Sequence, residues 1–361
     1  MSGKQLTDNR SLHLVKIYIM KDIFQELTAW VDEGKDIALA TVVNTWRSAP
    51  RPVGACLAID ENSRMTGSVS GGCVEKSVVA KAVGLLKAGG GELMSFGVGD
   101  EDAWEVGLSC GGKIEVFIER FMGSSKSGEK DREVWQGLKS SVEDDKGCVV
   151  VTRMSGEKER FLYKDDKTII GNASEGLAGQ ADDALKNRKS EMIVHEGEKY
   201  FMHVFTKKDK LLLVGSAHIT SELISLAAFY GFNTTVIDPR DTFAKNTTYT
   251  TSPGRIFVEW PQEVMPDMEL DEFTYAVNLS HDPKIDDESL AILLKSKVAY
   301  IGALGSKKTH EKRKARLLKR GFTEEEVARI HAPVGLDIGA ALPGEIALSI
   351  MAEIIKVKNG H

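Results

Sequence analysis

The sequence predicts an α/β protein with an N-terminal α/β domain built of two degenerate repeats and a C-terminal Rossmann-like, doubly wound parallel sheet. From residue 20 to 207, one order of helices and strands occurs twice, which indicates two copies of one unit. After Leu211, short apolar strands alternate with helices, as is typical of a parallel sheet covered on both faces. We therefore expect residues 1–19 to form an N-terminal extension, 20–207 one domain, and 208–361 a second domain.

Composition excludes several classes of function. The chain has 361 residues and a formal net charge of −6, which argues against general nucleic-acid binding. It has no apolar run long enough for a membrane span and no signal peptide, so we expect a cytoplasmic protein with reduced thiols. The four cysteines are Cys56, Cys73, Cys110 and Cys148, and no two of them have CxxC spacing. We therefore expect the protein to have no metal site of its own.

Each N-terminal copy begins with a helix. In the first copy, Phe24, Leu27 and Val31 recur at helical spacing, and Gly34 stands where a C-cap glycine is expected. The first copy then continues with strands at 37–43 and 56–59, a helix at 74–87 and a strand at 113–119. The second copy has a helix at 134–142, strands at 148–152 and 161–163, a helix at 177–189 and a strand at 200–205. Between its second strand and its second helix, residues 169–174 resemble residues 65–70 of the first copy.

The main candidate site is loop 68–75, with the sequence SVSGGCVE, which leads into the helix of the first copy. A Gly-Gly pair at a helix entrance leaves backbone N–H groups for an anion, so we assign Ser70, Gly71 and Gly72 to binding a phosphate. Cys73 is a candidate catalytic residue, because a helix entrance lowers the pKa of a thiol and favours the reactive thiolate. Glu75 is another candidate, although a nearby carboxylate raises the pKa of a thiol. Alternatively, Cys73 is a small hydrophobic residue in a tight turn.

A second loop repeats this pattern. Cys110, Gly111 and Gly112 precede the strand at 113–119, so the two cysteine loops could form two walls of one pocket. Arg47 and Arg51 lie in a stiff, proline-containing loop and could contact an anion, or could be solvated surface groups.

The second copy carries Glu-Gly-Leu at 175–177 in place of Gly-Gly-Cys. We therefore expect the first copy to hold the site and the second to be scaffold.

The C-terminal domain shows the layout of a dinucleotide-binding fold. The domain begins with a strand at 211–214, a helix at 219–229 and a second strand at 235–237, which is followed by Asp238. Further strands at 256–258, 275–279 and 298–301 give an expected sheet of five strands. Gly215 and His218 lie in the first turn. The G-x-G-x-x-G fingerprint keeps only its first glycine, because Ala217 replaces the second, and its methyl group would crowd a pyrophosphate. This substitution argues against tight NAD(P) binding.

Other candidate binding residues follow the strands of this sheet, where ligands of open α/β sheets bind. They are Asp238 and Arg240, His281 and Asp282, Gly305 and Ser306 before a cationic helix, and Asp337 in a rigid loop. The lysines and arginines of that helix could instead be its solvated face, and an isolated histidine is more often structural. A capping box at Thr323 and Glu326 and a proline at 343 mark the last two helix starts.

Seven short motifs together resemble the XdhC/CoxI family, whose members are accessory proteins of molybdenum hydroxylases such as xanthine dehydrogenase. The motifs lie at 71–75, 110–112, 238–240, 281–282, 302–306, 333–337 and 343–347, and the resemblance covers about residues 21–356. It implies an accessory protein, rather than a free-standing enzyme, that binds molybdenum cofactor (molybdopterin) transiently, protects it, and supports its sulfuration. It also implies delivery to a xanthine dehydrogenase-type apoenzyme of purine catabolism, a cysteine desulfurase partner and a homodimer.

Molybdenum binds soft sulfur ligands, so the resemblance makes Cys73, with Cys110 second, the candidate contact to the metal. Two alternatives stay open. One is an NAD(P)-dependent oxidoreductase that uses the C-terminal domain. The other is a thiol–disulfide sensor, which requires the Cα atoms of Cys73 and Cys110 within about 7 Å.

Overall fold

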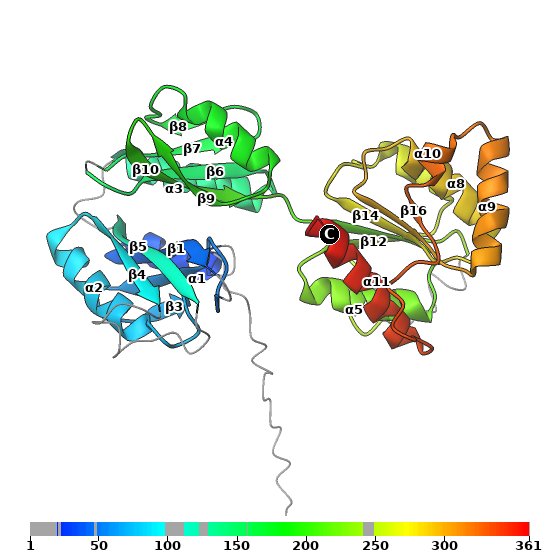
Figure 1. Cartoon of the computed structure of the whole chain (residues 1–361), viewed down its shortest axis with the longest axis horizontal. Coiled ribbons are helices and arrows are strands. Elements are labelled where there is room, and N and C mark those ends of the chain that lie inside the picture. Colours follow the sequence, from blue (N-terminus) through cyan, green and yellow to red (C-terminus); the bar gives the residue numbers. More distant parts are fainter. Residues whose placement is uncertain are drawn as a thin grey trace, which may run out of the picture. The chain divides into compact units, whose positions relative to one another are not determined.

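A computed structural model of the chain describes residues 20, 23–46, 49–97, 112–122, 129–156, 158–240 and 249–360. The chain forms two compact units, Met1–Lys207 and Lys208–His361, which we describe separately (Figure 1). The expected extension at 1–19 lies outside the described residues. Among the helices that are described, none combines the length and apolar character that a membrane span requires.

The first unit consists of two copies of one fold. The first copy comprises α1 (Phe24–Asp32), β1 (Ile37–Trp46), β2 (Cys56–Asp60), β3 (Met65–Gly67), α2 (Glu75–Ala88), β4 (Gly91–Gly97) and β5 (Lys113–Met122). The second comprises α3 (Glu129–Glu143), β6 (Cys148–Arg153), β7 (Arg160–Lys164), β8 (Ile169–Gly171), α4 (Leu177–Lys186), β9 (Glu191–His195) and β10 (Glu198–Phe205). The strand orders are β3-β2-β1-β5-β4 and β8-β7-β6-β10-β9, which confirms the predicted repeats.

Both sheets are antiparallel, and each contains two strands that we did not expect. The missed strands are β3 and β4 in the first sheet and β8 and β9 in the second, and all four lie at sheet edges. Their side chains are mostly half-buried or exposed, so they lack the alternation that marks a strand with one face in the core.

Two glycines occupy equivalent positions in the copies. Gly67 ends β3 with φ +94°, and Gly171 ends β8 with φ +96°. A Cβ atom at Gly67 would lie 2.2 Å from the carbonyl oxygen of Cys56, and one at Gly171 would lie 2.8 Å from that of Arg160. The same backbone constraint therefore requires glycine just before the turn in each copy.

Alternation along β1 sends successive side chains to opposite faces of the first sheet. Ala38, Ala40 and Val42 pack with α2, whereas Ile37 and Leu39 pack in a core that contains α1 and α3. That second core also includes Cys148 and Leu162 of the other sheet, so α1 and α3 contribute to a core that both copies share. The outer face of the second sheet is covered by α4.

The second unit is a parallel α/β fold. Its elements are β11 (Lys210–Val214), α5 (His218–Phe229), β12 (Asn233–Ile237), β13 (Arg255–Phe257), α7 (Pro261–Val264), η3 (Met265–Asp267), β14 (Thr274–Asn278), α8 (Pro283–Leu294), β15 (Tyr300–Ala303), α9 (Lys307–Lys319), α10 (Glu324–Val327), β16 (Ile330–His331) and α11 (Pro343–Lys358). The strand order is β13-β12-β11-β14-β15-β16, with all pairs parallel. The predicted Rossmann-like sheet is confirmed, but five strands is wrong, because the described residues form six.

The sixth strand, β16, has two residues, too few to show any periodicity in the sequence. Helices α5 and α11 cover one face of this sheet, and α8 and α9 cover the other (Figure 1). Because all its strands are parallel, their carboxyl ends lie at the same edge of the sheet. The predicted C-terminal site residues lie along this edge or in the loops beyond it.

Replacing either of the equivalent glycines by alanine should destabilise the first unit, because each position combines a positive φ with a blocked Cβ. We expect Gly67→Ala and Gly171→Ala to lower the free energy of unfolding by more than about 1–2 kcal/mol, the cost of left-handed backbone alone. Gly84→Ala in α2 is the control: no neighbour lies within 4 Å of its Cβ, and we expect about 0.5–1 kcal/mol of stabilisation. Urea denaturation measures all three, and unchanged stability of both turn variants would contradict this role.

Candidate functional site

Loop 68–73 is organised around the side chain of Glu75, the first residue of α2. The loop has two left-handed glycines, Gly71 with φ +79° and Gly72 with φ +118°, which turn its backbone N–H groups inward. Oε1 of Glu75 accepts hydrogen bonds from the Ser68 hydroxyl (2.8 Å) and from the backbone N–H groups of Val69 (3.3 Å), Ser70 (2.9 Å) and Gly71 (3.1 Å). Oε2 accepts from the Ser70 hydroxyl and from the N–H of Gly72 (2.9 Å).

These hydrogen bonds set the charge of Glu75. Burial alone would raise the pKa of this carboxyl group, but the hydroxyls of Ser70 and Ser68 and the N–H of Ser70 outweigh burial and lower the pKa from 4.5 to about 2. Glu75 is therefore ionised at neutral pH. The anion that Gly71 and Gly72 bind in this structure is the carboxylate of Glu75. The N–H groups that we expected to be available to a ligand are therefore already occupied.

Cys73 is the exposed residue among the three described cysteines. It stands just before Val74, which is fully buried and holds the loop against the core of the first copy. Cys56 and Cys148 are buried in strands, and burial raises the pKa of the Cys56 thiol to about 12 although a hydrogen bond to Thr41 opposes it. The structure thus separates one accessible thiol from two packed ones.

Three predicted site residues of the first unit have no described position relative to Cys73. Arg47, Cys110 and Gly111 lie outside the described residues, so neither the two-walled pocket nor the pairing of Cys73 with Cys110 is tested. Arg51 is half-buried in the turn before β2, and Gly112 is buried just before β5.

The second copy shows how the same turn is built without a Gly-Gly pair or a cysteine. Five residues, 172–176, separate Gly171 from buried Leu177, whereas six, 68–73, separate Gly67 from buried Val74. In the second copy, Glu159 accepts hydrogen bonds from the N–H (3.1 Å) and hydroxyl (2.6 Å) of Ser174. The extra residue of the first copy lies in the segment that carries Gly71, Gly72 and Cys73.

At the carboxyl edge of the second unit, Asp238 is fully buried and its carboxylate is engaged by neighbouring donors. It accepts hydrogen bonds from the N–H of Ser216 (2.7 Å) and from the backbone N–H (3.0 Å), Nε (2.9 Å) and Nη2 (2.8 Å) of Arg240. Nη1 of Arg240 donates to the carbonyl oxygen of Ser280 (3.2 Å). This pair links the ends of β11, β12 and β14. Gly215 closes the arrangement, because a Cβ there would lie 2.5 Å from the backbone nitrogen of Ser280.

This arrangement changes the reason for expecting weak nucleotide binding. In dinucleotide-binding folds, the acid at the end of the second strand binds the ribose hydroxyls, and the first turn receives the pyrophosphate. Here both oxygens of Asp238 already accept hydrogen bonds from Ser216 and Arg240. Ala217 has extended backbone at φ −130°, and its N–H donates to the Thr220 hydroxyl (3.2 Å).

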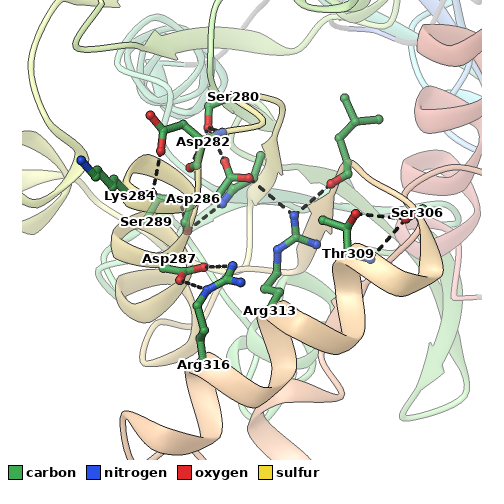
Figure 2. Close-up of polar contacts among 12 residues, drawn as sticks. Ser280, Asp282, Lys284, Asp286, Asp287, Ser289, Ser306, Thr309, Arg313 and Arg316 are labelled. Carbon is green, nitrogen blue, oxygen red and sulfur yellow. Dashed lines mark hydrogen bonds and ion pairs between the residues drawn. The ribbon is translucent and has the colours of Figure 1, made fainter.

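A buried polar cluster lies beneath the loops after β14 and β15. Asp286 accepts a hydrogen bond from the Ser280 hydroxyl (2.6 Å), and Arg313 Nη2 donates to the carbonyl oxygen of Leu304 (2.9 Å) and lies 3.5 Å from Asp286. Figure 2 shows the guanidinium between Asp286 and the turn that carries Ser306. Burial raises the pKa of Asp286, although Ser280 and Arg313 act in the opposite direction.

Two of the predicted residues beside this cluster cap helices. Asp282 caps α8 by accepting from the N–H of Lys284 (2.9 Å), and Ser306 caps α9 by accepting from the N–H of Thr309 (3.2 Å) (Figure 2). His281 is exposed, with a left-handed φ of +61°. The others are His218, which is exposed at the start of α5, Gly305 with φ +133°, and Asp337, which lies beyond β16.

Sequence reasoning missed two residues that organise these regions. Ser68 donates a hydrogen bond from its hydroxyl to Glu75. The sequence pattern that could have identified it is a hydroxyl residue shortly before a helix that begins with an acid. Arg313 was hidden in a run of cations, although it stands four residues before buried Leu317 and so on the buried face of α9. Within the described ranges, no group of three or more His, Cys, Asp or Glu side chains is positioned to hold a metal ion.

Known proteins resemble the chain over both units. The family model described as "XdhC and CoxI family" matches residues 30–97, and that described as "XdhC Rossmann domain" matches residues 211–354. A Bacillus subtilis relative, named as a probable subunit of xanthine dehydrogenase, is 26% identical over 92% of this chain and 96% of its own. The Escherichia coli "Molybdenum cofactor insertion chaperone PaoD" is 25% identical over 90% of this chain and 84% of its own. A Bacillus halodurans crystal structure titled a xanthine dehydrogenase matches with a TM-score of 0.71 and 25% identity, covering 93% of this chain and 96% of that one.

The hydrogen bonds to Glu75 predict a pH dependence. A carboxyl group whose folded pKa of about 2 lies below its ordinary 4.5 stabilises the fold fully above pH 4.5 and loses that contribution as the pH falls toward 2. We expect the difference in unfolding free energy between wild type and Glu75→Gln to be constant from neutral pH down to about 4.5 and to shrink below it. Urea denaturation at a series of pH values measures this, and a difference that stays constant below pH 4.5 would contradict the assignment.

Proposed function

The chain belongs to the XdhC and CoxI family, and from this we propose that it is an accessory protein that binds molybdenum cofactor and inserts it into a xanthine dehydrogenase-type apoenzyme. The names of two relatives support an accessory role for molybdenum enzymes: one is an insertion chaperone for this cofactor, and the other is a probable subunit of xanthine dehydrogenase.

The observation that carries the proposal is the difference between the two copies in the first unit. Both copies build the same turn from a glycine-ended strand into a helix, and the shorter turn at 172–176 contains no cysteine, so the fold itself does not require Cys73. Both turns end in a buried residue, Val74 or Leu177, but only the longer turn also carries an exposed thiol, that of Cys73. A feature that folding does not require, in a loop held by six hydrogen bonds, is best explained by function.

The chemistry of the proposed cargo fits this thiol. Molybdenum with a dithiolene accepts soft sulfur ligands, and Cys73 supplies one on the protein surface. We assign the metal contact to Cys73, with Cys110 as the second candidate. Arg47 and Arg51 remain proposed contacts to the anionic part of the cargo, because arginine forms charge-assisted hydrogen bonds to phosphate.

Finer features of the proposal follow from the family resemblance. In our proposal the cofactor is bound transiently and protected, it acquires its sulfido ligand here with sulfur from a cysteine desulfurase, and the chain acts as a homodimer in purine catabolism. A cytoplasmic location belongs to the proposal, because a thiol that must stay reduced requires a reducing compartment.

The proposal predicts that one cysteine is essential for transfer. We expect Cys73→Ser to keep the wild-type melting temperature but to lower activation of the apoenzyme in a reconstituted assay by about 10- to 100-fold or more, because even outer-shell partners of a metal contribute that much. Cys56→Ser is the matched control, since its thiol is buried in β2, and we expect near-normal activation.

Full activation by Cys73→Ser together with failure of Cys110→Ser would move the metal contact to Cys110. Full activation by both variants would contradict a cysteine contact altogether.

A second candidate function is an NAD(P)-dependent oxidoreductase, which the parallel sheet and the glycine turn at Gly215 favour. We expect titration calorimetry with NADH to give a dissociation constant no tighter than about 1 mM, or about −4 kcal/mol. Ala217→Gly should not restore tight binding, because Asp238 stays engaged by Ser216 and Arg240. Micromolar binding by wild type would make the oxidoreductase the leading function.

A further inference from the structure

We propose that loop 68–73 receives the metal–sulfur end of the cofactor and excludes its phosphate, with Glu75 as the positioning residue that determines this orientation. The inference rests on the proposed function and adds the chemical class that the loop accepts: a soft, electrophilic metal centre rather than an oxyanion.

The first argument concerns hydrogen-bond donors. A glycine turn at a helix entrance binds phosphate through inward-facing N–H groups. Here the N–H groups of residues 69–72 all donate to Glu75, and the N–H of Val74 donates to the Ser70 hydroxyl (3.0 Å). A phosphate would have to displace a carboxylate that also accepts from two hydroxyls.

The second argument concerns charge. Both oxygens of Glu75 only accept hydrogen bonds, as those of an ionised carboxylate do, so a phosphate entering the turn would meet a like charge at short range. Glu75 thus disfavours the phosphate end of the cargo, and the exposed thiol of Cys73 is a soft ligand for the metal–sulfur end.

The third argument concerns access. Gly71, Gly72 and Cys73 are all exposed, and a Cβ on either glycine would meet no atom within 4 Å. The glycines are required by their positive φ and not by crowding, so the outer side of the loop is open to a bulky group. Because Glu75 fixes the inner side, Cys73 is held on a preorganised turn.

The test measures alkylation of Cys73 by iodoacetamide, followed by mass spectrometry, in the presence and absence of inorganic phosphate. We expect phosphate to leave the wild-type rate unchanged. In Glu75→Ala the donors become available, and phosphate at about ten times its dissociation constant should slow alkylation about tenfold. Glu75→Gln, which keeps the volume of the side chain, should show the same effect more weakly.

The matched control is Glu159→Gln, because Glu159 accepts the hydrogen bonds of Ser174 in the turn of the second copy. It should change stability without making Cys73 sensitive to phosphate. This comparison separates a positioning role of Glu75 from a general structural one.

Protection of wild-type Cys73 by phosphate would overturn the inference, and so would insensitivity of both Glu75 variants. These measurements use the cofactor-free chain, so they stand even if the protein binds no cofactor. Conversely, phosphate protection of wild type leaves the transfer assay with Cys73→Ser intact as a test of the proposed function.

Discussion

The first unit depends on one constraint: a glycine turn that points its N–H groups inward must supply an acceptor for them. Glu75 supplies it from the first position of α2, with both oxygens used and its pKa lowered to about 2. This interaction joins the turn to the helix, fixes the left-handed glycines, and leaves Cys73 on the outer side. Local folding and the properties of the site therefore have the same cause.

The second unit solves the same problem in another way. Its glycine turn directs the N–H of Ser216 to the fully buried Asp238, whose charge Arg240 neutralises. Neither turn is a ready anion site, because each already holds a carboxylate of the chain. The two differ in exposure: the Asp238 carboxylate is sealed beneath the sheet edge, whereas the loop held by Glu75 opens to solvent at Cys73.

Much of the fold could be predicted from the sequence because it follows from hydrophobic periodicity. The repeats, the parallel sheet and the candidate turn all came from residue types and spacing. The edge strands β3, β4, β8 and β9 and the two-residue β16 could not be predicted, because half-exposed or very short strands show no pattern. The role of Glu75 was missed for a different reason: a sequence shows that an acid follows a glycine turn but not that its side chain folds back into it.

We propose that this chain carries molybdenum cofactor, and the composition of the purified protein tests this most directly. The chain would be isolated from cells that make molybdopterin, and its bound pterin and molybdenum would be assayed against an unrelated protein purified in the same way. The account predicts pterin and molybdenum in equal amounts, both well above the control. Pterin and molybdenum at control levels would contradict it.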